Sequence, residues 1–184
     1  MPLLDIHVLG SPILRQETKP VERMTDELRR LADDMFETMY VAKGIGLAAP
    51  QVGRPERLAV IDIENDPIVV VNPEILLTEG SARGEEGCLS IPEVFGDVDR
   101  ATRITMRALN RDGEPFELEA TDLLARCLQH EIDHLHGKLF IDYLSFLKRR
   151  SALAKWASMS KDFPQSIRKL PPDEIAGRHG EEAL

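Results

Sequence analysis

The segment from Thr121 to His136 constrains this chain most, because it combines an apolar helical pattern with a cluster of ionisable groups. Its leucine, isoleucine and cysteine side chains fall on most sides of a helix rather than along one stripe, which is typical of a buried helix. Within it, His130-Glu131-Ile132-Asp133-His134 places two imidazoles at positions i and i+4, on one face and one turn apart. Both imidazoles can reach one ion, so the spacing predicts half of a tetrahedral metal site.

The helix alone does not identify the third ligand. A catalytic zinc site normally has three protein ligands and leaves one position for water. The layout H-E-x-x-H-x-x-G-x-x-H fails because its third histidine would be Phe140, and a downstream glutamate fails because the next one after Glu131 is Glu174. Cys88, which follows Gly87 in a short segment, remains, and its thiolate would be a strong, soft ligand. A buried free cysteine is more often a small hydrophobe, so Cys88 receives this role only together with the two histidines.

Further regular elements are expected on either side of the central helix. Thr25 is a candidate N-cap for a helix over residues 25–42, and another helix is predicted over residues 145–160. Strands are predicted by apolar, β-branched runs at Leu58–Ile63, Ile68–Val71, Ile104–Leu109 and Pro115–Ala120, the last two as a hairpin. Because strands and helices show no βαβ rhythm, we expect an α+β fold with antiparallel or mixed β-sheets packed around the central metal-binding helix.

Length and composition exclude several classes of protein. The chain has 184 residues, of which 42% are hydrophobic and 30% charged, as in a folded globular domain. Its first residues have no basic or long apolar leader, and no segment approaches the roughly 18 apolar residues of a membrane span. We therefore expect no membrane association and a cytoplasmic location. A disulfide is not expected, because one of the two cysteines belongs to the metal pattern.

The charge of the chain is unevenly distributed. A formal net charge of −9 argues against DNA binding by the surface as a whole. Between residues 148 and 169, however, seven lysines and arginines are accompanied by a single acidic residue, Asp162. A solvated helix face is the ordinary interpretation of such a run.

Three segments together resemble the motifs of peptide deformylases. Gly44–Gln51 reads G-I-G-L-A-A-P-Q, Glu86–Ser90 reads E-G-C-L-S, and Gln129–His134 reads Q-H-E-I-D-H, in the order and approximate spacing of that family. The likeness extends over most of the first 150 residues, so we expect a catalytic domain over residues 1–150 and a C-terminal helical extension and tail over residues 151–184. The resemblance implies removal of the N-formyl group from the N-terminal formylmethionine of newly synthesised polypeptides, with release of formate.

The metal chemistry expected here needs an acid/base beside the ion. A metal held by Cys88, His130 and His134 can lower the pKa of a bound water towards neutrality. Glu131 follows a ligand on the helix and is expected to take a proton from that water and later give it to the departing amine. Asp133 is available to orient an imidazole, although its role could equally be structural. The resemblance implies one divalent ion, usually Fe²⁺, and purified protein could hold Zn²⁺, Ni²⁺ or Co²⁺ instead.

The resemblance also implies roles for residues that the spacing alone leaves open. The Gln51 side-chain amide and the Leu89 backbone N–H are expected to stabilise the oxyanion, whereas by its own position Gln51 could be an ordinary loop residue. An extended peptide is expected to pair with exposed backbone near Gly44, in a form of β-augmentation. The expected substrate-binding residues are Gly44, Ile45, Gly46, Gly87, Leu123 and Cys127.

Two other functional classes remain open alternatives. A zincin-like metallopeptidase would cut internal peptide bonds, but Cys88 and the missing downstream ligands count against it. A purely structural zinc site would need a fourth cysteine or histidine, and the remaining histidines lack the spacing for it. If the chain acts on N-formylmethionyl nascent peptides, the basic segment 148–169 is a candidate contact with ribosomal RNA phosphates, set against its interpretation as a solvated helix.

Overall fold

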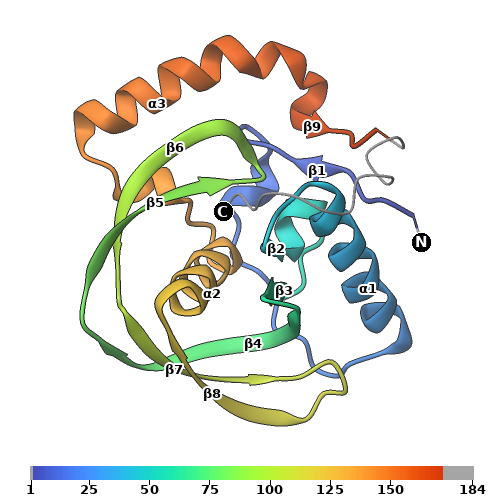
Figure 1. Ribbon diagram of the computed structural model, residues 1–184. Helices are drawn as coiled ribbons and strands as arrows, with labels where there is room; N and C mark the ends of the chain where they lie inside the picture. Colours follow the sequence, from blue (N-terminus) through green and yellow to red (C-terminus); the bar gives the residue numbers. More distant parts are fainter. Residues whose placement is uncertain (1, 172–184) are drawn as a thin grey trace.

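The central helix α2 (Asp122–Leu135) is surrounded by antiparallel strands (Figure 1). The computed structural model describes residues 2–171, so the end of the predicted C-terminal tail, residues 172–184, lies outside the described residues. The other elements are, in chain order, β1 (Ile6–His7), α1 (Asp26–Val41), β2 (Gly46–Ala48), β3 (Leu58–Ile63), β4 (Asp66–Glu79), β5 (Ala82–Cys88), β6 (Ile91–Arg100), β7 (Arg103–Leu109), β8 (Pro115–Thr121), α3 (Phe146–Met159) and β9 (Ile167–Arg168), with short 3₁₀ turns at Pro12–Arg15, Ala49–Val52, Phe140–Tyr143, Ser160–Asp162 and Pro164–Ser166.

The strands form three antiparallel groups. Five strands make one sheet in the order β2-β3-β4-β7-β8, so β2 and β8 are its edges. Strands β5 and β6 form a separate ribbon, and β1 pairs with β9 near the two ends of the described chain. The predicted α+β class, with strands around a central helix, is confirmed, and the predicted hairpin is β7–β8.

The helix ends follow from local sequence. Thr25 caps α1 by accepting a hydrogen bond from the Leu28 N–H at 3.3 Å. After α2, Gly137 adopts a left-handed φ of 73°, as predicted for a glycine that follows a helix. A Cβ atom at Gly137 would also lie 2.7 Å from the Arg15 carbonyl oxygen, so this turn requires glycine for two reasons. The turn fixes where α2 stops, directly after His134 and Leu135.

The short strands β1 and β9 and the longer strands β5 and β6 were not predicted, and the length of β4 was underestimated. Strand β4 extends over Asp66–Glu79 rather than Ile68–Val71; its second half is largely exposed, and its only apolar run there, residues 75–77, is separated from Val71 by Asn72, Pro73 and Glu74. The ribbon β5–β6 was not predicted, since β5 is rich in glycine and glutamate. In β6, every other residue from Val94 to Arg100 faces inward to some degree, and this period of two was the available signal.

Helix α3 lies along the outside of β6 (Figure 1). Its buried residue is Trp156, whose indole N–H donates to the Leu9 carbonyl at 3.2 Å. Trp156 belongs to the same apolar cluster as Cys88, and the domain boundary expected at residue 150 falls within this helix. Among residues 2–171, no helix is long and apolar enough to cross a membrane.

Candidate metal centre and active site

Two elements that are distant in the sequence bring three metal-ligating side chains together. Cys88 ends β5, while His130 and His134 lie one turn apart on α2. Their Sγ and Nε2 atoms all lie within 4.8 Å of one another. Cys88 Sγ is 3.3 Å from His134 Nε2, and the two Nε2 atoms are 3.2 Å apart.

These distances fit a tetrahedral ion. With metal–nitrogen bonds of about 2.0–2.1 Å and a metal–sulfur bond of about 2.3 Å, neighbouring donors of a tetrahedral site lie about 3.3–3.6 Å apart. Burial holds the pKa of His134 well below its ordinary value, and the nearby His130 lowers it further, which favours the neutral imidazole that binds metals. Cys88, His130 and His134 could therefore hold one metal ion with three protein ligands.

A buried carboxylate orients one of the imidazoles. His130 Nδ1 lies 2.9 Å from Glu86 Oε1, so an Nδ1–H donated to Glu86 leaves the Nε2 lone pair facing the other two ligands. The Oδ2 atom of Asp133 instead accepts hydrogen bonds from Arg100 at 2.6 Å and from the Tyr143 hydroxyl at 2.7 Å. Of the two roles left open for Asp133, these contacts favour the structural one, and the carboxylate beside His130 comes from β5.

Glu86 remains ionised although it is 2% exposed. Burial alone would raise its pKa, but hydrogen bonds from Arg100 and His130 lower it to about 2. Arg100 donates to both carboxylate oxygens at 2.9 Å, a bidentate contact. The carboxylate that faces His130 is thus a fixed negative charge.

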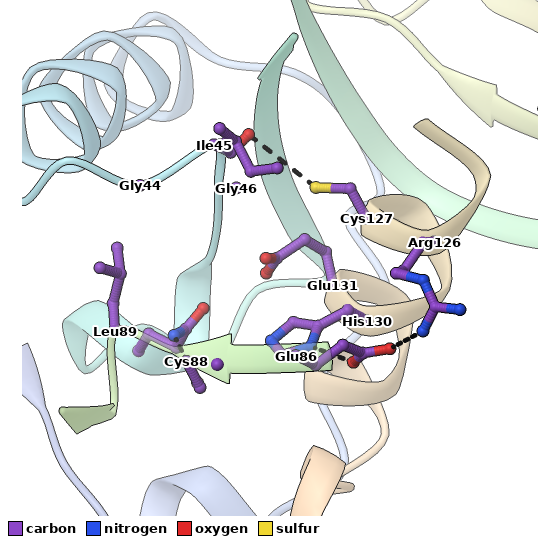
Figure 2. A pocket seen from close by; sticks show the side chains of 12 residues that line it. Gly44, Ile45, Gly46, Glu86, Cys88, Leu89, Arg126, Cys127, His130 and Glu131 are labelled. Atoms are coloured by element: carbon purple, nitrogen blue, oxygen red, sulfur yellow. Dashed lines mark hydrogen bonds and ion pairs between the residues drawn. The ribbon is translucent and has the colours of Figure 1, made fainter. Parts of the chain in front are cut away.

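Glu131 has the opposite environment. Its side chain is 4% exposed, and its Oε2 atom is buried without a hydrogen-bond partner among the described residues. Burial raises the pKa of Glu131 to about 7, although the nearby His130 acts to lower it. Glu131 lies beside His130 and faces the strand segment at Ile45 and Gly46 (Figure 2). A carboxyl group with such a pKa can both accept and donate a proton near neutral pH.

A small cavity adjoins Glu131 and two of the three donors, Cys88 and His130. Its volume is about 30 Å³, enough for one or two water molecules. The residues that line it come from β2, β5, α2 and the connections between them: Gly44, Ile45, Gly46, Gln51, Glu86, Gly87, Cys88, Leu89, Arg126, Cys127, His130 and Glu131. All the predicted site residues are among them except His134 and Leu123. His134 is buried as one of the three donors, and Leu123 lies on the first turn of α2, 37% exposed.

Gln51 is held rigidly behind the cysteine. The Ala48 N–H donates to its Oε1 at 2.9 Å, and its Nε2 donates to Ser90 Oγ at 3.1 Å. The same Nε2 lies 3.6 Å from Cys88 Sγ. Leu89 is in the short connection between β5 and β6, and its side chain covers Gly44, where an added Cβ would lie 2.7 Å from Leu89 Cδ1. These contacts join the β2 segment to the ribbon that carries Cys88.

Cys127 differs from Cys88 in its surroundings. Its Sγ lies 3.9 Å from the Ile45 carbonyl oxygen, and it is not part of the three-donor group. Burial, followed by the charge of Glu131, raises the pKa of its thiol well above the ordinary value. It forms an uncharged part of the cavity wall.

Two residues of the site had not been identified from the sequence. Glu86 lies inside the E-G-C-L-S segment, so its place beside Cys88 was the available signal. Arg126 lies four residues before His130, one turn away on α2, and this spacing could have indicated it. Neither was assigned a role, because a charged residue on an exposed face and one in a buried network look alike in a single sequence.

A buried cysteine and two histidines, with a carboxyl group beside them and space for water, form the arrangement of a metal-dependent hydrolase with a single ion. The family model described as polypeptide deformylase matches residues 3–150. The chain belongs to this family, whose members are metal-dependent hydrolases that remove the N-formyl group from nascent peptides.

Individual relatives are similar to this chain over most of their own length. A peptide deformylase from Alkalilimnicola ehrlichii is 58% identical over 154 residues, which cover 82% of this chain and 86% of that protein. The crystal structure of a peptide deformylase from Legionella pneumophila has a TM-score of 0.84 at 50% identity and covers 87% of this chain and 96% of its own. That of a peptide deformylase from Synechococcus elongatus in complex with actinonin has a TM-score of 0.81 at 48% identity, over 85% and 87% of the two chains.

Proposed function

We propose that this chain releases formate from N-formylmethionyl nascent peptides by using Cys88, His130 and His134 as metal ligands and Glu131 as the acid/base. The observation that carries the proposal is the buried Glu131 carboxyl, which lies beside the three-donor group with a pKa near 7. The reaction would take place in the cytoplasm, where nascent chains are made.

The residues divide the hydrolysis between them. A divalent ion bound by the three ligands would polarise the formyl carbonyl and acidify a water molecule. Glu131 takes a proton from the attacking water and transfers it to the peptide nitrogen, so that the C–N bond breaks, formate leaves and the peptide gains a free amino group. Glu86 keeps the His130 imidazole in the tautomer that presents Nε2, and it neither gains nor loses a proton.

Two donors would stabilise the negative charge that develops on the carbonyl oxygen. The Gln51 amide is directed towards Cys88 and is fixed by its contacts with Ala48 and Ser90, so little reorganisation would be needed. The Leu89 backbone N–H follows the ligand Cys88 directly. One such donor typically contributes about 3–4 kcal/mol, or roughly 10²–10³ in rate.

The substrate backbone would bind along β2. This strand is an edge of the five-stranded sheet and pairs with β3 on one side, so its other side can accept an extended peptide. Gly44, Ile45 and Gly46 would supply the backbone contacts, and Gly87 would allow close approach on the opposite side. Cys127 would line the pocket for the methionine side chain, with Leu123 at its exposed rim.

The test is formate release from a formyl-Met peptide, measured together with the metal content of the protein. We propose Fe²⁺ as the working ion, with Zn²⁺, Ni²⁺ or Co²⁺ as replacements acquired during purification. Cys88→Ser, His130→Ala and His134→Ala should each lose stoichiometric metal. Cleavage of internal bonds in casein without formate release would instead identify a zincin-like metallopeptidase.

A second proposal concerns the C-terminal part of the chain, where we assign residues 151–184 to an extension beyond the catalytic domain and the basic segment 148–169 to a contact with the ribosome. No acidic residue occurs in α3, which carries Lys148, Arg149, Arg150 and Lys155 on a chain of net charge −9. This charge supports a contact with ribosomal RNA phosphates. Replacing the four cations with Gln should weaken ribosome binding and flatten its salt dependence, without changing activity on a free formyl-Met tripeptide. Equal ribosome affinity of variant and parent at low salt would leave α3 as a solvated helix.

A further inference from the structure

We propose that Arg126 is a positioning residue of the metal centre, because it fixes the ribbon that carries Cys88 to the helix that carries both histidines. The inference deepens the proposed function and rests on its assignment of the metal ligands. The question is how the three proposed ligands, which come from β5 and α2, are kept close enough together to bind one ion. Arg126 itself contacts none of the three ligands in any recorded hydrogen bond.

The contacts of Arg126 cross from α2 to both strands of the ribbon. Its Nη1 donates to Glu86 Oε2 at 2.8 Å and to the Val98 carbonyl at 2.9 Å, and its Nη2 donates to the Ala82 carbonyl at 2.8 Å. A longer contact of 3.5 Å joins Nη1 to the Gly84 carbonyl. Figure 2 shows the guanidinium extending from α2 to Glu86, on the side of Glu86 away from His130. One side chain thus connects α2 to β5 and β6 at once.

Gly84 provides an independent indication that this position is built for a guanidinium. A Cβ atom at Gly84 would lie 3.0 Å from Arg126 Cζ, 3.1 Å from Nη2 and 3.2 Å from Nε. The planar group therefore lies against the bare backbone of β5. Gly84 has no left-handed φ that would otherwise require glycine, so the close approach of Arg126 is the reason that the structure offers for it.

Arg126 also completes the bonding of Glu86. The carboxylate accepts two hydrogen bonds from Arg100, one from Arg126 and one from His130, which is about the number that its lone pairs allow. Arg100 is shared with Asp133, whereas the other acceptors of Arg126 are uncharged carbonyls. Among the described residues, Glu86 is thus the one carboxylate to which Arg126 donates a hydrogen bond. Without it, Glu86 is free to shift towards Arg100 and away from His130.

The consequence is a specific effect on metal retention. Loss of a contact behind a ligating histidine typically costs about 10- to 100-fold in metal affinity or activity. Loss of Arg126 combines this effect with a looser ribbon, which displaces Cys88 relative to the two histidines. Because the unbranched Cβ–Cγ–Cδ–Nε stem of arginine and the Cβ–Cγ–Sδ–Cε chain of methionine are similar in bulk, Arg126→Met keeps the cavity wall and removes only the donors.

The experiment compares metal release from three variants. Arg126→Met removes the donors, and Gly84→Val displaces the guanidinium without altering Arg126. Arg83→Met is the matched control. Arg83 precedes Gly84 on β5 and forms an exposed ion pair with Asp99. The protein is loaded with Co²⁺, the rate of metal removal by a chelator is measured, and the thiolate-to-cobalt absorption band is recorded. For Arg126→Met and Gly84→Val we expect about tenfold or greater acceleration of release and a shifted band, with neither change in Arg83→Met.

Two further measurements separate positioning from general destabilisation. Thermal unfolding identifies variants that are less stable overall, and steady-state kinetics should show a lower kcat with a nearly unchanged KM for Arg126→Met. If Arg126→Met does not fold, Gly84→Val carries the same prediction. Release rates and cobalt spectra equal to those of Arg83→Met would overturn the proposal, even if the melting temperature fell. A parent protein that binds cobalt but releases no formate would contradict the proposed function and leave this inference standing.

Discussion

A Cβ atom placed on Gly46 would lie 2.5 Å from Oε1 of Glu131 and 2.9 Å from Sγ of Cys127. Backbone of β2 therefore lies directly against the acid/base, and no side chain fits between them. The relationship links the strand proposed to bind substrate with the group proposed to move the proton. It also means that the position of Glu131 depends on a residue that has no side chain of its own.

Gly46→Ala should therefore reduce turnover while leaving metal content intact. The added methyl group displaces the Glu131 carboxyl, and a misplacement of about 1 Å can cost roughly 10²-fold in rate. Gly96→Ala on β6 is the matched comparison, because its methyl group meets the flexible Leu144 side chain instead. Formate release and metal analysis on both variants check this. A normal kcat in Gly46→Ala would show that Glu131 does not need its present position.

Glu131→Gln should retain stoichiometric metal and lose about 10²–10⁴-fold or more in kcat. The amide keeps the shape of the carboxyl group but cannot accept the proton of the attacking water. Metal analysis beside steady-state kinetics provides the measurement. Metal-free Glu131→Gln protein would contradict the acid/base role and point to Glu131 as a ligand.

Gln51→Leu should lower kcat much more than it raises KM. The amide contact with the developing oxyanion strengthens in the transition state, so its loss affects the chemical step more than binding. Leucine also leaves the Ala48 N–H without its present acceptor, so the stability of the variant is measured in parallel. An effect confined to KM would assign Gln51 to substrate binding.

Glu86→Gln should destabilise the metal-free protein far more than Glu74→Gln does. Glu86 pairs with an Arg100 that is 5% exposed, and breaking a buried pair typically costs about 3–5 kcal/mol. The pair of Glu74 with Arg107 is more than half exposed on both sides, and such pairs contribute about 0–1 kcal/mol. Urea unfolding of both variants at neutral pH makes the comparison. Equal losses would mean that the Glu86 network can be replaced at little cost.

Asp142→Asn should lower the free energy of unfolding at neutral pH. The difference between the variant and the parent should become smaller as the pH falls. Burial alone would raise the pKa of Asp142, but hydrogen bonds from Arg15 and the Leu139 N–H hold it below its ordinary value. A carboxyl whose folded pKa is depressed stabilises the protein above the unfolded value, about 3.9, and that contribution is lost as the pH falls through the folded pKa. Unfolding curves of parent and variant should therefore converge below about pH 4. A difference that stays constant would assign the effect to packing.

The parts of the fold with regular apolar patterns were predictable, and the β5–β6 ribbon was not. Helix α2 and its end at Gly137 follow from side-chain spacing and turn chemistry, which are local properties. In β5, glycine and glutamate residues stand where strands usually have β-branched residues. Its conformation therefore depends on tertiary contacts rather than on local propensity. Gly84 is an example, because its place is explained by Arg126, which lies 42 residues away.

The candidate site divides in the same way. The two histidines at i and i+4 could be paired from spacing alone, and Cys88 by exclusion together with the resemblance. For the orienting carboxylate, the sequence offered only the nearby Asp133, with a structural role equally open, whereas Glu86 reaches His130 across 44 residues. Contacts of this kind depend on strand register, which no single-residue pattern encodes.

The pairing of β1 with β9 sets Ile6 opposite Arg168. Residues near the two ends of the described chain are thus hydrogen-bonded to each other. Joining the two ends of residues 2–171 by a linker and opening the chain at the Asn110–Gly113 turn, where the tip of the hairpin is exposed, would give a circular permutant that keeps the three proposed metal ligands in place. In such a permutant α2 would belong to the first part of the chain to be synthesised, and the strand that carries Cys88 would come near the end, followed only by β6 and β7.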